Sequence, residues 1–158
     1  MKKQLNTKIP TNRKQEILLA TKVIVFTALF LFASSLMLTS LFTSGDDIRG
    51  YWLLIMGWAG LIIFQFSWFA NPINLLALLL LQQQPKLALL LSFIALIFAS
   101  QSFFLSEIPT GISHGKIFIK EFGLGFYLWY LSQSLFFLGI LVEVIVGHKK
   151  TGTSPVFT

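Results

Sequence analysis

Charged residues divide the chain into four long apolar stretches. None of the following holds an Asp, Glu, Lys or Arg: Val23–Gly45, Gly50–Pro85, Leu87–Ser106 and Phe122–Val142. About 20 apolar residues in a helix cover a hydrocarbon core about 30 Å thick, so each stretch can span a membrane. Inside the core only helices and closed barrels satisfy their backbone groups, and these stretches lack the alternation of barrel strands. We therefore predict an all-α integral membrane protein with four transmembrane helices in an antiparallel bundle.

The second stretch is too long for one straight span. A helix over Tyr51–Leu81 would be about 46 Å long, against a core of about 30 Å. Pro72 removes a backbone donor and disfavours helical dihedral angles at Asn71, so we predict a kink near Pro72. We expect Ile73–Leu81 to bend along the inner interface or to continue as a helical extension. The predicted transmembrane domain covers residues 17–146, with spans at residues 17–42, 51–81 (broken near 72), 86–105 and 122–146.

The segments between the predicted spans are short. Residues Thr43–Gly50 contain Gly45-Asp46-Asp47 and read as a tight turn. The segment Glu107–Glu121 is the only sizeable one outside the membrane. We expect neither segment to fold as a domain.

The composition agrees with a membrane protein and excludes several function classes. Hydrophobic residues make up 55% of the chain, and the mean hydropathy is +0.77. The net charge of +6 comes mostly from cations near the two ends, and no basic stripe with interleaved aromatics suggests nucleic acid as a partner. With no cysteine in the chain, disulfide chemistry and thiolate metal sites are excluded. We predict no cofactor.

The distribution of cations predicts the orientation. Nine Lys or Arg residues lie on the side of the termini and three on the other side: Arg49, Lys116 and Lys120. The positive-inside rule therefore places both termini in the cytoplasm, most simply in a bacterial cytoplasmic (inner) membrane. Residues 1–16 form a basic N-terminal segment and residues 147–158 a cytoplasmic tail. A cleaved signal peptide is the competing reading of the first span, but apolar character continues past Ala33-Ser34-Ser35 and no A-x-A site follows.

Small and polar residues recur along the predicted spans. The third span carries a row of residues that allow close helix contact: Ser92, Ala95, Ala99, Ser102 and Ser106. Packing is the simplest account of such rows. The alternative is a polar track through the bundle, formed by Gln65, Asn71 and Gln133 with Ser67, Gln101 and Ser132. A small oligomeric transporter or channel could use such a track.

Two ionisable residues lie within or at the edge of the spans, Lys22 and Glu143. Such residues are costly in lipid and usually serve a purpose. We expect Glu143 to lie at the inner boundary, where it pairs with Lys22 or Lys86. The alternative is a carboxylate that couples to protons or binds a cation.

The chemistry-bearing residues outside the spans are sparse. His114 shares the outer loop with Glu107, Lys116, Lys120 and Glu121, the one cluster that offers a general base beside cations. Solvated loop charge is the simpler account, and a lipid-modifying enzyme is the weakest of three hypotheses. We predict no catalytic, cofactor-binding or metal-binding residue.

The leading hypothesis is a non-enzymatic membrane protein that works through protein contacts. Examples are an accessory subunit of a membrane complex or an immunity or regulatory factor. The expected partners are membrane lipid and another integral membrane protein or a second copy of the chain. The candidate structural or interaction residues are Gln65, Trp68, Asn71, Pro72, Gln133, Glu143 and Lys22.

Overall fold

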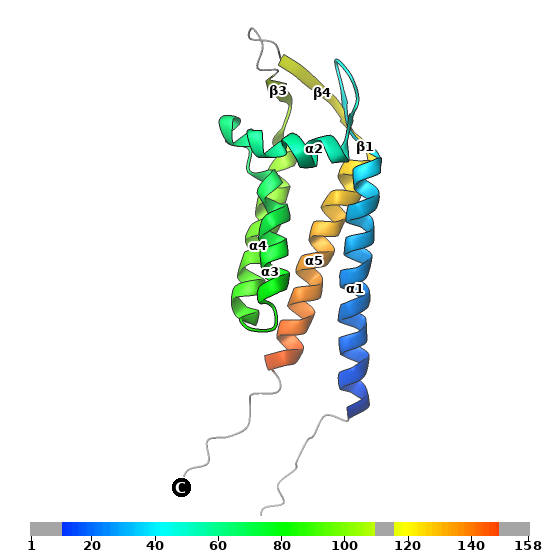
Figure 1. The fold of residues 1–158 in the computed structure, drawn as a ribbon, viewed down its shortest axis with the longest axis vertical. Coiled ribbons are helices and arrows are strands. Elements are labelled where there is room, and N and C mark those ends of the chain that lie inside the picture. Colours follow the sequence, from blue (N-terminus) through cyan, green and yellow to red (C-terminus); the bar gives the residue numbers. More distant parts are fainter. Residues whose placement is uncertain (1–10, 110–115, 149–158) are drawn as a thin grey trace, which may run out of the picture.

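The computed structural model describes residues 11–109 and 116–148. Four helices run along its long axis (Figure 1): α1 (Thr11–Met37), α3 (Ala70–Leu80), α4 (Pro85–Gln101) and α5 (Leu124–His148). Three segments of the described chain are long and apolar enough to cross a membrane: Leu19–Met37, Pro85–Phe104 and Leu124–Ile145. α3 has only 11 residues, short of the roughly 20 that a span needs. The chain is mostly helical, with three helices that could span a membrane by length and composition. The predicted four-helix transmembrane bundle is not confirmed, and the all-α class is wrong because the chain also forms a sheet.

The lengthwise helices pack around α5. α1 packs along α5, α3 packs on α4, and α4 in turn packs on α5, which lies between them (Figure 1). Small residues form the contacts, with Ala77 and Ala88 packed at Ile140 in one cluster. The predicted small-residue row of α4 is buried from Ser92 to Ser102, whereas Ser106 is exposed. Small side chains here let the helix backbones approach closely, which drives helix association in lipid.

The predicted kink at Pro72 is wrong, because the second apolar stretch is broken earlier and more completely. It contains α2 (Gly50–Met56), the 3₁₀ helices η1 (Gly57–Ile63) and η2 (Ser67–Phe69), and then α3. α2 runs across the ends of the lengthwise helices (Figure 1). The chain reverses at Phe64, whose φ of 57° lies in the left-handed region. Pro72 lies in the first turn of α3, where a missing backbone donor is tolerated.

The course predicted for Ile73–Leu81 is also wrong. We expected this segment to bend along the inner interface or extend beyond it, but α3 runs lengthwise and pairs with α4. The segment that lies crosswise is α2. The prediction failed because residues 50–63 are as apolar as a membrane span. Hydropathy alone does not distinguish a membrane-spanning helix from an apolar helix that lies crosswise.

A four-stranded antiparallel sheet joins the two segments between the predicted outer ends of the spans. It contains β1 (Thr39–Thr43), β2 (Ile48–Arg49), β3 (Glu107–Pro109) and β4 (Lys116–Phe122), in the order β2-β1-β4-β3. In the central pair, Leu41 lies opposite Phe122. The predicted tight turn is present between β1 and β2, where Thr43 Oγ1 donates to the carbonyl of Asp46. The sheet itself was not predicted, because strands from separate segments satisfy one another's backbone groups.

The two ends of the described chain lie at the same end of the molecule. The start of α1 and the end of α5 are opposite the sheet (Figure 1). The polar residues Gln82–Gln84 form the turn between α3 and α4, close to where we expected a polar connection. Most of the N-terminal segment, nearly all of the tail and His114 lie outside the described residues.

Candidate functional site

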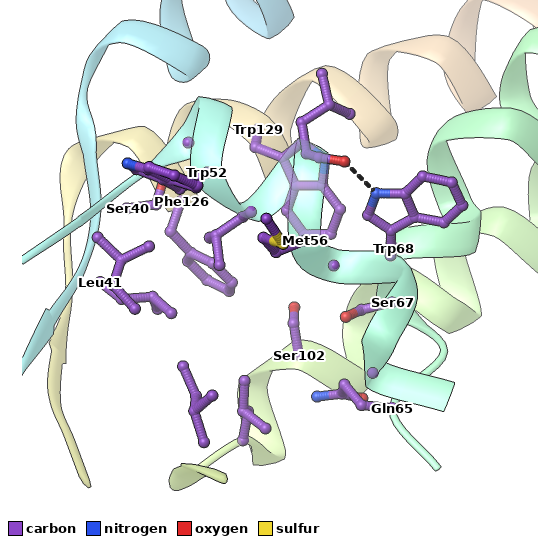
Figure 2. Close-up of a pocket in the computed structure, with 18 of the residues that line it drawn as sticks. Ser40, Leu41, Trp52, Met56, Gln65, Ser67, Trp68, Ser102, Phe126 and Trp129 are labelled. Carbon is purple, nitrogen blue, oxygen red and sulfur yellow. Dashed lines mark hydrogen bonds between the residues drawn. The ribbon is translucent and has the colours of Figure 1, made fainter. Parts of the chain in front are cut away.

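A pocket of about 850 Å³ lies where α2 and η1 cross the ends of the lengthwise helices, beneath the sheet. Its walls come from most parts of the chain at this end of the molecule. They comprise the end of α1, the β1–β2 segment, the α2–η2 segment, Asn71 of α3, residues that follow α4, Phe122 of β4 and the start of α5. Most of the lining side chains are apolar, and Figure 2 shows Leu41, Met56 and Phe126 among them. The volume is in the range of small-molecule sites, which are mostly apolar with a few placed polar groups.

Polar side chains line two sides of the pocket. Figure 2 shows Gln65, Ser67 and Ser102 on one side and Ser40 on the other, and Asp46 and Asp47 of the β1–β2 segment also belong to the lining. The Oε1 atom of Gln65 is buried without a hydrogen-bond partner among the described residues. Ser102 Oγ donates to the carbonyl of Ala99 in the last turn of α4. Gln65 Oε1 has less than 1 Å² of accessible surface, so it does not face the open part of the pocket.

An amide cluster, defined as Asn71, Asn74 and Gln133, lies next to the pocket between α3 and α5. Asn71 lines the pocket, and its Oδ1 accepts hydrogen bonds from Trp129 Nε1 at 2.9 Å and Gln133 Nε2 at 3.1 Å. Gln133 Oε1 accepts from Asn74 Nδ2 at 2.6 Å. The side chains of Asn74 and Gln133 are 2% and 1% exposed. The structure thus brings Asn71 and Gln133 of the proposed track together, while Gln65 stays outside this cluster.

Sequence reasoning missed Trp129 as a member of this site. Its indole donates to Asn71, and its side chain lines the pocket. The signal was the spacing, because Trp129 precedes Gln133 by four residues and such pairs share one face of a helix.

Gln101 holds the break in the second apolar stretch. Its Oε1 accepts from the backbone N–H of Phe66 at 2.8 Å, and its Nε2 donates to the carbonyl of Phe64 at 2.7 Å. The side-chain amide of Gln101 therefore pairs with one backbone N–H and one backbone carbonyl of the loop. Backbone groups that have no partner within a helix need other hydrogen-bond partners when they are shielded from water.

Trp68 fixes the crosswise segment over the pocket. Its Nε1 donates to the carbonyl of Leu54 at 2.7 Å (dashed in Figure 2). The indole also packs directly on Gly57, where a Cβ atom would clash with Trp68 Cδ1. The pair explains why a glycine is present inside this apolar segment.

The ionisable candidates lie apart from the pocket. Lys22 is exposed and Glu143 is half-buried on α5. The expected ion pair of Glu143 with Lys22 or Lys86 is not formed. The ion pair found within residues 11–109 and 116–148 joins Lys116 Nζ to Glu107 Oε1 at 2.6 Å. Over the same residues, no group of three or more His, Cys, Asp or Glu side chains could hold a metal ion.

Comparisons with protein-family models, with curated proteins and with solved structures found no match to this chain.

Proposed function

We propose that the chain is an integral membrane protein that binds a lipid-like amphiphile in the pocket beneath the sheet. One observation carries the proposal: an apolar pocket of about 850 Å³ lies at the ends of helices that are long enough to span a membrane. Apolar walls with a few polar groups suit a molecule with an alkyl chain and a polar head. The role is binding rather than catalysis.

The lining includes residues of three lengthwise helices. Phe32 and Leu36 of α1 line the pocket, as do Asn71 of α3 and Trp129 of α5. A ligand in the pocket would therefore contact helices on both sides of α5.

We further propose a bacterial cytoplasmic membrane, with both termini in the cytoplasm and the sheet outside. The excess of Lys and Arg near the termini supports this orientation. The common location of the two described ends, opposite the sheet, agrees with it. The pocket then lies at the outer interface, where Tyr51, Trp52 and Trp129 are suitable boundary residues.

A second proposal is the accessory role expected from the sequence, in which the chain contacts another membrane protein. The supporting observation is the outer face of α1, where Phe26, Phe30 and Met37 are at least 70% exposed. This face can contact either lipid or a partner helix. The test is copurification from native membranes. A second membrane protein in stoichiometric amount, absent when Phe26→Ala and Phe30→Ala are combined, would support this proposal. Purification of the chain alone would count against it.

Photo-crosslinking tests the amphiphile pocket. The full chain is reconstituted in lipid nanodiscs that contain a lipid with a diazirine near the end of its acyl chain, and mass spectrometry maps the modified residues. We expect Phe126 and Trp129 of the pocket to be modified at low probe fractions at which lipid-facing Phe30 is not. The modification should saturate, because a pocket has a fixed capacity.

A matched pair of variants controls this experiment. Ala59 lines the pocket, whereas Ala33 is exposed on α1 and is not part of the lining. Ala59→Trp should fill the pocket and remove the modification of Phe126 and Trp129, whereas Ala33→Trp should leave it unchanged. Equal, non-saturating labelling of Phe30 and Trp129 would overturn the proposal, as would labelling that Ala59→Trp does not reduce in a folded protein.

A further inference from the structure

We infer that the amphiphile in the pocket carries an uncharged carbonyl group, as in an acyl ester, which accepts hydrogen bonds from the side-chain amide of Asn71 and the hydroxyl of Ser67. The inference rests on the proposed function and names the ligand class of the same pocket. It is carried by the fixed orientation of the Asn71 amide, by the place of Ser67 on the same helix face and by the charges of the lining.

The orientation of the Asn71 amide is fixed by its neighbours. An indole N–H can only donate, so the Asn71 atom that lies 2.9 Å from Trp129 Nε1 must be the oxygen, Oδ1. Gln133 Nε2 donates to the same oxygen. Both hydrogen bonds of the Asn71 side chain therefore end on Oδ1, which leaves the amide nitrogen without a partner among the described residues.

This amide nitrogen is an accessible donor. Asn71 is half-buried and lines the pocket. Its nitrogen is not among the side-chain atoms that are both fully buried and unpaired, in contrast to Gln65 Oε1. The two N–H groups of Asn71 are therefore free to donate to a molecule in the pocket, and a head group that can only donate would leave them unpaired.

Ser67 adds a hydroxyl on the same face. Helix η2 ends at Phe69 and α3 begins at Ala70, so the helical backbone continues from Ser67 to Asn71. Residues four apart share one face of a helix. Both residues line the pocket, and Figure 2 shows the Ser67 oxygen turned toward the middle of the pocket. Because a hydroxyl rotates to suit its partner, Ser67 can donate to the group that Asn71 binds.

The charges of the lining favour an uncharged acceptor. Among the described residues that line the pocket, Asp46 and Asp47 are the charged ones, and none is Lys, Arg or His. A phosphate or carboxylate that left water for these apolar walls would find no cation, and burial of an unpaired charge is costly. An ester or amide carbonyl accepts the same hydrogen bonds at a much smaller desolvation cost.

The test is competition against the diazirine lipid in nanodiscs of ether-linked phosphatidylcholine, so that the host lipid brings no carbonyl. Monolauroylglycerol and 1-O-dodecylglycerol share a glycerol head and a twelve-carbon chain, and they differ in the ester carbonyl. Dodecyl phosphate represents an anionic head, and dodecylammonium represents a head that can only donate. Amounts are expressed as mole fractions in the disc, which removes differences in partitioning. We expect monolauroylglycerol to halve the labelling of Trp129 at a fraction about 5-fold lower than the ether and about 10-fold lower than either charged amphiphile.

Two variants remove the donors. Asn71→Asp keeps an oxygen for Trp129 and Gln133 but loses the amide nitrogen, and Ser67→Ala loses the hydroxyl. Each should bring the ester and the ether closer together, and Asn71→Asp should bring them within about 2-fold. Ser134→Ala is the matched control, because its hydroxyl donates within α5 and Ser134 lies outside the lining, so the ratio should not change. Thermal unfolding checks that each variant is folded, and Ser67→Ala alone decides the test if Asn71→Asp is not.

The outcomes distinguish the inference from the proposed function. Saturable labelling that the ester and the ether remove at equal mole fractions would overturn the inference and leave the pocket intact. A preference for the ester that is undiminished in every folded variant would also overturn it, because the carbonyl would then be bound elsewhere. Labelling that is not saturable with any probe would instead overturn the proposed function itself.

Discussion

The indole of Trp129 donates to the Oδ1 atom of Asn71 across 2.9 Å, and the same oxygen accepts a second bond from Gln133. This shared acceptor links the pocket wall to the interior between α3 and α5. The direct packing of α3 is mainly on α4, so these bonds are what fix its first turn relative to α5. The position of the pocket wall formed by Asn71 and Trp129 therefore depends on the side chain of Asn71.

Replacement of that asparagine should cost more than replacement of either donor alone. Asn71→Leu leaves two donors without their acceptor, and we expect a loss of about 1–2 kcal/mol in unfolding free energy. Trp129→Phe removes one bond and should cost less, near the average of about 0.6 kcal/mol for cross-helix bonds in membranes. Reversible unfolding in one detergent measures both.

Ser134→Ala serves as the control for this series. Its hydroxyl donates only to the carbonyl of Tyr130 in the same helix, so the change should be close to neutral. An Asn71→Leu variant as stable as Ser134→Ala would show that the two bonds to Asn71 do not hold α3 to α5, although the Asn74–Gln133 bond remains in that variant.

Gln101 should stabilise the loop at the end of η1. Gln101→Leu leaves the Phe66 N–H and the Phe64 carbonyl without partners, which predicts a loss of about 1–3 kcal/mol. Amide hydrogen exchange at Phe66 should become faster by a corresponding factor. Gln83→Leu, in the exposed turn between α3 and α4, is the matched substitution and should leave that exchange unchanged.

The position of the break predicts opposite results at Phe64 and Pro72. A β-branched residue is strained at positive φ, so Phe64→Val should cost about 1–2 kcal/mol and Phe64→Gly should remove the strain. Pro72→Ala should be close to neutral, because Pro72 lies in the first turn of α3. Thermal unfolding compares the three variants, and a large effect of Pro72→Ala with a silent Phe64→Val would place the break where the sequence first suggested.

Cysteine accessibility tests the proposed orientation in a chain that has no cysteine of its own. Lys120 is exposed on β4 and Gln83 is exposed in the turn at the opposite end. In intact cells an impermeant maleimide should label Lys120→Cys, whereas Gln83→Cys should react only after lysis. The reverse pattern would place the termini outside.

The long helices could be predicted from the sequence because each depends on a local property. Apolar runs gave α1, α4 and α5 directly, and the small-residue row from Ser92 to Ser102 gave the buried face of α4. The second apolar stretch shows the limit of that method. Hydropathy counts apolar residues without regard to direction, so α2 could not be distinguished from part of a span.

The sheet and the pocket depend on pairings between distant segments. β1 and β4 are separated by more than 70 residues, and their strands are short. The run Ile117-Phe118-Ile119, of residue types enriched in strands, was a usable signal for a strand, although nothing local identified its partner. The amide cluster was foreseen in part: polar residues on separate spans suggested a common track, yet only tertiary contact decides that Asn71 meets Gln133 while Gln65 lies outside the cluster.

The strand order β2-β1-β4-β3 also constrains the sequence of events during biogenesis. As the chain emerges from the ribosome, β1 and β2 are made long before β4, so one edge of β1 stays unpaired while α3 and α4 are made. That edge is closed only when β4 has been made, and α5 follows it to pack beside α1. The first and last helices of the described chain thus meet late, and the pocket forms only at that final step. A ribosome stalled before β4 would hold an open β1 edge, which is the interval in which a chaperone or a second nascent chain could pair with it.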